Sequence, residues 1–280
     1  MSEPARYNPG YGQVDRDYGR RLATTQAADD GPVWMVNLMA YKPVASYPEG
    51  LSAAVSGREA DDRYAPVGIL ADIGAEVVLH GDVERHLLGD SPRWDRVGVV
   101  RYPTRRSFIE MQVRPDFQAK HVHKEAGMAT TIVMVTVPSP LPSVDPGQLE
   151  SWDAVEHPPT PSDGPIVVVH VIRYAEGSGR DEMAAYQAQA VIAARGHGGR
   201  IGGWFDVEGT IIGDGRRWDQ VRFNVFPSLA AFMAVVTDPA RLEAQRAHRE
   251  AAMEDTYTLI VRPQINRLDG MPQPGGRPWA

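Results

Sequence analysis

The feature that most constrains this chain is a segment that occurs twice. Residues 83–97 read VERHLLGDSPRWDRV and residues 207–221 read VEGTIIGDGRRWDQV. Eight of these 15 aligned positions are identical, whereas unrelated segments would share about one. The similarity extends downstream, where HKEA at 123–126 matches HREA at 248–251. The chain is therefore an internal duplication of two homologous units.

The apolar periodicity of each copy predicts the order strand, helix, two strands, helix, strand. This βαββαβ order is that of the ferredoxin-like fold, in the α+β class. Such a sheet carries helices on one face only, and its bare face must be covered. We expect the two copies to cover each other as an intramolecular pseudo-dimer, a dimeric α/β barrel with its ligand cavity between the sheets. The expected strands are 33–41, 76–83, 96–102 and 131–137, then 166–174, 200–207, 220–226 and 256–261.

The expected helices and domain boundaries follow the same repeat. The first helix is expected over 58–73, ended by Gly74, and the second is expected to break near Pro115. Residues 138–165 hold eight prolines, which is typical of a spacer. The expected organisation is a polar N-terminal arm (1–31), a first repeat (32–138), a Pro-rich linker (139–164), a second repeat (165–267) and a C-terminal tail (268–280).

Composition excludes several classes of function. The chain has no cysteine, which excludes disulfides, thiol nucleophiles and thiolate metal sites. The net charge of −7 argues against a nucleic-acid partner. No apolar run approaches the roughly 18 residues of a membrane helix, and residues 1–10 lack the apolar region of a secretory signal, so none is expected. We expect a cytoplasmic protein with no membrane partner, no cofactor and no metal site, and with a small molecule as its partner.

Each copy resembles the dimeric α/β-barrel superfamily, and more narrowly a small bacterial family described only as a domain of unknown function. The resemblance rests on Gly57-Arg58 with Tyr64, Gly89-Asp90 with Trp94-Asp95, Tyr102-Pro103-Thr104, and HVHKEAG at 121–127. The second copy departs from it at Arg246 and Ala252. The superfamily includes cofactor-free monooxygenases, polyketide cyclases, lactone isomerases, haem enzymes and ligand-sensing modules. The resemblance therefore implies the fold and leaves the reaction open.

Strand alternation places His170 in the middle of the second copy's first strand, on the face that we assign to the cavity. Val167, Val169 and Val171 are expected to face the helices. Arg222 and Asn224 alternate onto the cavity side of a later strand. His170 is either a core histidine with a satisfied hydrogen bond or a general base. Arg222 either forms a cross-sheet salt bridge or holds an oxyanion.

Further candidates come from positions that recur in both copies or flank the expected cavity. His123 is a second catalytic candidate, although repetition in both copies also suits a structural role at a helix end. Trp204 has a ring that could stack on a flat substrate. The substrate-binding candidates are Asn37, Tyr41, Tyr174, Trp204, Arg58, Tyr64, His248, Met35 and Met39.

These residues favour a cofactor-independent enzyme acting on a small, partly apolar, oxygenated metabolite. The chemistry is proton transfer at carbon, in a cyclisation, isomerisation, elimination or rearrangement. His170 would move the proton, and Arg222 and Asn224 would stabilise the oxyanion. A tailoring role in secondary metabolism is what the resemblance implies.

Three alternatives stay open at this point. They are a cofactor-free, O2-dependent monooxygenase, a non-catalytic small-molecule-binding or stress-linked barrel, and a haem-dependent barrel. An open pocket in which His170, Arg222 and Asn224 converge favours an enzyme. A cavity filled by Met35, Met39, Phe223 and Ile172 favours the binding barrel. The sequence leaves open whether the pseudo-dimer pairs again as a homodimer.

Overall fold

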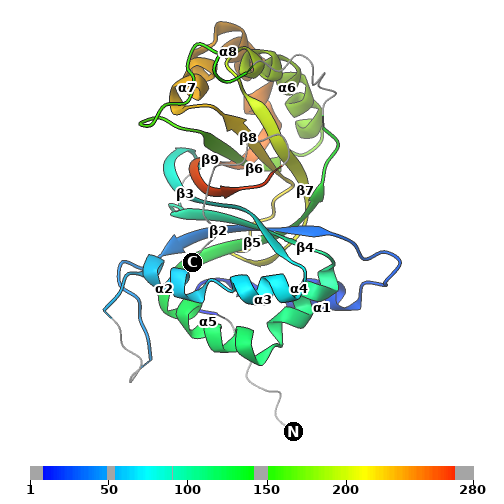
Figure 1. Cartoon of the computed structure of the whole chain (residues 1–280). Helices are drawn as coiled ribbons and strands as arrows, with labels where there is room; N and C mark the ends of the chain where they lie inside the picture. Colours follow the sequence, from blue (N-terminus) through cyan, green and yellow to red (C-terminus); the bar gives the residue numbers. More distant parts are fainter. Residues whose placement is uncertain (1–8, 49–53, 90, 142–150, 269–280) are drawn as a thin grey trace. The chain divides into compact units, whose positions relative to one another are not determined.

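The computed structural model describes residues 9–48, 54–89, 91–141 and 151–268 (Figure 1). Parts of the expected N-terminal arm and linker, and all but one residue of the expected C-terminal tail, lie outside these ranges. The chain divides into two compact units. Unit 1 comprises Met1–His80, Pro92–Val137 and Val207–Arg217, and unit 2 comprises Gly81–Ser91, Pro138–Asp206 and Trp218–Ala280.

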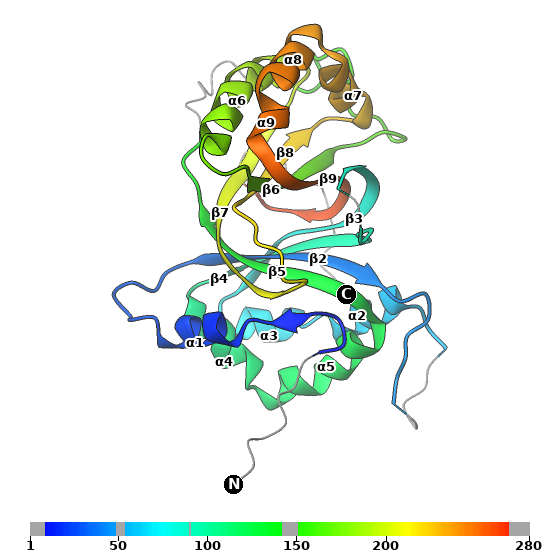
Figure 2. The same ribbon diagram turned by 180° about the vertical axis from the view of Figure 1, so that it is seen from behind.

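Unit 1 is an antiparallel sheet with helices on one face. Its strands are hydrogen-bonded in the order β1-β7-β5-β2-β4-β3, with β7 and β3 shared with unit 2. In both views, α1 to α5 lie on the same side of β2, β4 and β5 (Figures 1 and 2). The elements are β1 (Gln13–Val14), α1 (Arg16–Thr24), β2 (Val33–Tyr41), α2 (Gly57–Tyr64), α3 (Val67–Asp72), β3 (Glu76–Leu88), β4 (Arg96–Tyr102), α4 (Arg105–Gln112), α5 (Pro115–Gly127) and β5 (Met128–Pro138).

Unit 2 repeats the arrangement, with strand order β3-β9-β6-β8-β7. Helices α6 to α9 cover one face of β6, β8 and β9 (Figure 2). Both units are therefore of the α+β class with antiparallel strands, as the periodicity predicts. The elements are β6 (Ile166–Tyr174), α6 (Gly179–Gly196), β7 (Arg200–Gly213), β8 (Gln220–Phe226), α7 (Leu229–Thr237), α8 (Pro239–Ala244), the π-helix η2 (Gln245–Arg249), α9 (Glu250–Ala252) and β9 (Met253–Asn266).

The expected helix over 58–73 is two helices, α2 and α3. Pro66 separates them because proline lacks an amide hydrogen and restricts the residue before it. Gly74 follows α3 with a φ of 70°, in the left-handed region that favours glycine. The break near Pro115 is present, since α4 ends at Gln112 and α5 begins at Pro115.

Two glycines allow α2 and α5 to approach closely. A Cβ atom at Gly57 would lie 2.3 Å from the carbonyl oxygen of Gly127, and one at Gly127 would lie 2.4 Å from the carbonyl oxygen of Gly57. In unit 2 the corresponding pair is Gly179 and Ala252. A Cβ atom at Gly179 would lie 2.9 Å from the carbonyl oxygen of Ala252. The glycine of the repeated Gly-Arg motif is therefore explained by close backbone packing.

The expected assignment of the sheet faces is wrong. Val168 packs with Val235 of α7, and Ile172 packs with Met183 of α6, so the row that contains His170 faces the helices. Val167, Val169 and Val171 lie on the opposite face and are equally buried. Alternation could not separate the two faces because both sides of this strand are apolar.

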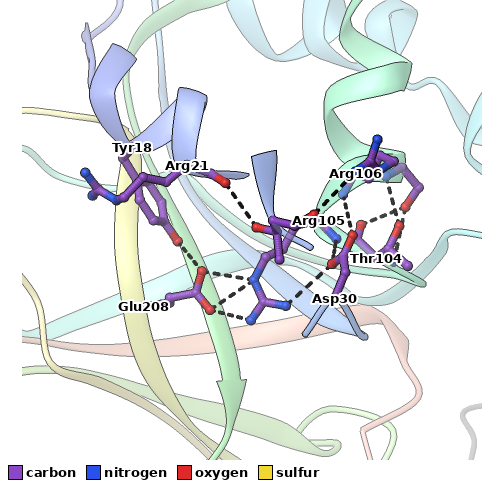
Figure 3. Close-up of polar contacts among 9 residues, drawn as sticks. Tyr18, Arg21, Asp30, Thr104, Arg105, Arg106 and Glu208 are labelled. Atoms are coloured by element: carbon purple, nitrogen blue, oxygen red, sulfur yellow. Dashed lines mark hydrogen bonds and ion pairs between the residues drawn. The ribbon is translucent and has the colours of Figure 1, made fainter. Parts of the chain in front are cut away.

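A hairpin of the second repeat is held in unit 1 by ionic contacts. The Glu208 carboxylate, on β7, accepts hydrogen bonds from the Arg105 guanidinium and from the Tyr18 hydroxyl at 3.0 Å (Figure 3). Asp30 accepts hydrogen bonds from the backbone amides of Arg105 and Arg106 at the start of α4. Arg105 lowers the pKa of Glu208, chiefly through these hydrogen bonds.

We expect Glu208→Gln to destabilise the protein by about 1 kcal/mol, because it removes the nearer of two carboxylates from the partly buried Arg105 and leaves it Asp30, 3.6 Å away. Denaturant unfolding at pH 7 measures the change. Since the Glu208 pKa is lowered on folding, its contribution is present at neutral pH and is lost as pH falls below 4.5, the ordinary glutamate value. The control is Glu254→Gln, which breaks a more exposed ion pair with Arg173. Equal losses in the two variants would contradict the prediction.

Candidate functional site

A cavity of about 350 Å³ lies inside unit 2, between the helices and the helix-facing side of the sheet. The candidates that we expected in a cavity between two sheets line this cavity instead. His170, Arg222 and Asn224 all line it, as the strand alternation placed them on one face. Its other lining residues are Leu141, Val168, Tyr186, Gln187, Ala190, Val191, Ala194, Arg195, Gly199, Arg200, Ile201, Phe226, Phe232, Val235, Arg241, Arg249 and Thr258.

Strand register sets four polar or aromatic side chains in a row. Trp204 on β7 pairs with Arg222 on β8, which pairs with His170 on β6. His170 in turn pairs with Thr258 on β9. The Thr258 hydroxyl is buried and makes no hydrogen bond within the described chain. Directly paired residues share a face of the sheet, and three of this row, Arg222, His170 and Thr258, line the cavity.

Arg222 is held by neutral partners. Its guanidinium donates to the side-chain oxygen of Gln220 at 2.5 Å, to that of Gln187 at 2.7 Å and to the Tyr174 hydroxyl at 3.2 Å. It also lies 4.1 Å above the centre of the Trp204 ring, a cation–π distance. Burial lowers the pKa of Arg222. These contacts fix the guanidinium plane without neutralising its charge.

Arg249 brings a second guanidinium to His170. It is the last residue of η2, and its Nη2 lies 3.5 Å from Nε2 of His170. Because arginine only donates, this contact places the imidazole lone pair on Nε2 and the proton on Nδ1. Burial, then Arg249 and Arg222, hold the pKa of His170 well below its usual value. His170 is therefore a neutral base at pH 7.

Asn224 lies two residues beyond Arg222 on β8. Its side-chain oxygen accepts a hydrogen bond from the Trp204 indole at 3.3 Å. A second cavity of about 540 Å³ shares Arg222 and Gln187 with the first, so the hydrogen-bonded pair of these residues lies in a wall common to both.

The remaining candidates of the second repeat are divided between these two cavities and the surface. Tyr174 and Trp204 line the second cavity and contact Arg222. His248 lies outside both linings, and its Nδ1 is 2.7 Å from the Glu182 carboxylate.

The candidates of the first repeat pack within unit 1. Tyr41 donates to Asp61 at 2.6 Å and lies beneath the Arg58 guanidinium. Nδ1 of His123 lies 2.8 Å from the Tyr47 hydroxyl. The others lie among the apolar residues of unit 1 or bond to its backbone: Asn37, Tyr64, Met35 and Met39.

Sequence reasoning missed Arg249, Gln187, Gln220 and Thr258. Arg249 had a usable signal, because the first repeat also has a basic residue at this position, Lys124. The sequence held no such signal for Gln187 and Thr258. Finding Gln187 requires knowing which face of α6 points to the sheet, and finding Thr258 requires knowing which face of the sheet points to the helices. Among the described residues, no group of three or more His, Asp or Glu side chains is arranged to hold a metal ion. Within the same ranges, no helix has the length and apolarity needed to cross a membrane.

A scan of protein-family models finds no match, and a search of curated proteins finds none. Among solved structures, the chain is similar to a protein of unknown function from Rhodopseudomonas palustris, with a TM-score of 0.41 and 26% identity over 47% of this chain and 99% of that one. It is also similar to an anthrone oxidase-like protein, with a TM-score of 0.48 and 14% identity over 88% and 99% of the two chains.

A third similar structure is chlorite dismutase from Candidatus Nitrospira defluvii in complex with imidazole. The TM-score is 0.48, with 13% identity over 89% of this chain and 95% of that one. The last two neighbours are dimeric α/β-barrel proteins. The activities in these names are those of the other proteins.

Acid should destabilise the protein through two histidines, the buried His170 and the partly buried His121. Burial lowers the pKa of His170 well below 6.5 and that of His121 to about 4. The unfolded chain therefore binds protons below pH 6.5 that the folded chain does not, and the free energy of unfolding falls as pH falls from 7 to 5. We expect His170→Asn and His121→Asn each to flatten this dependence in urea titrations. The half-exposed His157→Asn is the control, and an unchanged slope in the first two variants would contradict the assignment.

Proposed function

We propose that this protein is a cofactor-independent enzyme that moves a proton at a carbon atom of a small, partly apolar, oxygenated metabolite. The observation that supports it is the convergence of His170, Arg222 and Asn224 on one cavity of about 350 Å³. The volume lies at the small end of the range for ligand pockets. The alternative of a non-catalytic barrel required a cavity filled by apolar side chains, and it is the less favoured reading.

The proposed reaction uses three side chains. Nε2 of His170 accepts a proton from a carbon next to a carbonyl group. The C–H bond breaks, an N–H bond forms, and the electron pair moves through a new C=C bond onto the carbonyl oxygen. Arg222 and the Asn224 amide stabilise that enolate oxygen, and return of the proton at another position completes an isomerisation. No oxidant or reductant is needed.

The relation between the two repeats is a second part of the proposal. We propose that the two repeats form the intramolecular counterpart of a dimeric α/β barrel. Strands β3 and β7 support it because each contributes to both units. The catalytic groups are proposed for the second repeat alone, where His170 and Arg222 stand at the positions of Asn37 and Gly98 in the first.

Proton exchange in D2O tests the proposal without knowledge of the product. The protein is incubated with small ketones and keto acids, including acetoacetate, phenylpyruvate and neutral cyclic ketones. Nuclear magnetic resonance then follows loss of the hydrogen signal next to the carbonyl. We expect accelerated exchange for at least one compound and a loss of about 100-fold or more in His170→Asn. Asparagine is chosen because the first repeat carries it at this position.

The control variant is His157→Asn, which changes a histidine of unit 2 that does not line the cavity. It should exchange at the rate of the unaltered protein. Full activity in His170→Asn, or no exchange with any compound, would overturn the proposed function. Oxygen uptake that accompanies substrate loss would instead favour the monooxygenase alternative.

A further inference from the structure

The cavity of unit 2 has positive charge and no carboxylate in its described lining. Arg222 and Arg249 are only 6% and 8% exposed, and Arg241 also lines the cavity. Within the described ranges, none of the three forms an ion pair with Asp or Glu. The carboxylate that acts on Arg222 is Asp206, which accepts a hydrogen bond from the Gln220 amide at 2.9 Å instead of from the guanidinium.

In unit 1, by contrast, the buried cations lie beside carboxylates. There Arg96 lies 3.3 Å from the Asp61 carboxylate and 2.7 Å from that of Asp62. Asp61 also accepts the Tyr41 hydroxyl and favours the charged form of the buried Lys124. Asp61 and Asp62 thus compensate Arg96, and Asp61 also favours the charge of Lys124.

The second repeat has lost this carboxylate. In the aligned sequences, Met183 and Ala184 replace Asp61 and Asp62, while Arg249 stands at the position of Lys124. Met183 is fully buried and packs with Tyr174, the counterpart of Tyr41. Burial of a cation is costly unless an anion compensates it. In the described part of the chain, Asp206 and Glu250 act on Arg222 and Arg249 without forming an ion pair, so an anion bound in the cavity would compensate both cations.

We propose that the substrate is a carboxylic acid, bound as its carboxylate by the guanidinium groups of Arg222 and Arg249 on either side of His170. This inference deepens the proposed function and rests on it. Apolar side chains also line the cavity, among them Val168, Phe226, Phe232 and Val235. The substrate is therefore a monocarboxylate with an apolar or aromatic body.

The position of Arg249 gives the carboxylate a second effect. In this structure Arg249 donates to Nε2, the atom that the proposed reaction needs as its proton acceptor. A bound carboxylate is a stronger acceptor than a neutral imidazole and draws the guanidinium toward itself. Substrate binding then frees the lone pair of His170. Tyr186, on α6, lies beneath the Arg249 guanidinium and accepts a hydrogen bond from Arg241. This helix residue therefore contacts the guanidinium groups of Arg249 and Arg241.

Calorimetric titration with charged and neutral probes tests the proposal. The probes are benzoate, cyclohexanecarboxylate and hexanoate, each compared with its neutral amide. We expect at least one carboxylate to bind at least tenfold more tightly than its amide. Arg222→Gln and Arg249→Gln should each weaken that binding about tenfold or more. Arg217→Gln, at an exposed position outside the cavity, should leave it unchanged.

A second pair of variants keeps the test independent of the arginine substitutions. Met183→Asp restores the carboxylate of the first repeat and should weaken carboxylate binding, because an internal anion then occupies the cations. Met183→Leu should bind as the unaltered protein does. Thermal unfolding confirms that each variant is folded. Retained binding in folded Met183→Asp would overturn the inference.

Failure of this inference is distinguishable from failure of the proposed function. Equal binding of acids and amides, no binding of any carboxylate, or no effect of the arginine variants would overturn the carboxylate assignment. Exchange of neutral ketones in D2O could still uphold the enzyme. Conversely, arginine-dependent carboxylate binding without any exchange would uphold the carboxylate site and overturn the catalytic role of His170.

Discussion

Each unit depends on backbone hydrogen bonds that the other repeat supplies. In unit 1, β5 has the far half of β7 as its neighbour, and in unit 2, β9 has the far half of β3. Without these hairpins both strands would be open edges with unpaired amide and carbonyl groups. Two equivalent glutamates secure the exchange, Glu208 to Arg105 in unit 1 and Glu84 to Arg262 in unit 2. Neither sheet is complete within one repeat, which is why the duplication matters for folding.

Much of the fold could be predicted from periodicity and repetition. The strand at 166–174 and its partner at 220–226 have the expected bounds, and their register brings His170 opposite Arg222. The face they occupy could not be predicted, because valine and isoleucine fill both sides of β6. The direction of Arg249 could not be predicted either. It lies in a π-helical turn, in which side chains point in different directions from those of the α-helix expected there. Alternation could therefore group His170, Arg222 and Asn224 on one face, but it could not predict the side of the sheet or the residues that the helices add.

The two units differ in the groups that contact their buried cations. In unit 1, carboxylates neutralise the cations, and Met35, Tyr64 and Phe117 belong to a packed apolar core. In unit 2, the cations have neutral hydrogen-bond partners and face a cavity. Conserving two identical sites would place two cavities and two sets of uncompensated charge in one chain. Specialising the units confines that cost to one of them.

The neutral partners of Arg222 are as significant as the missing carboxylate. An aspartate in place of Gln220 would hold the guanidinium equally well and would also neutralise it, leaving little attraction for an anion. Glutamine, tyrosine and a second glutamine fix the same plane while preserving the full charge. The Trp204 ring beneath the guanidinium does likewise, since a cation–π contact leaves the charge in place. Unit 2 is thus built to hold a cation rigid and unneutralised, which is the arrangement that electrostatic stabilisation of an anion requires.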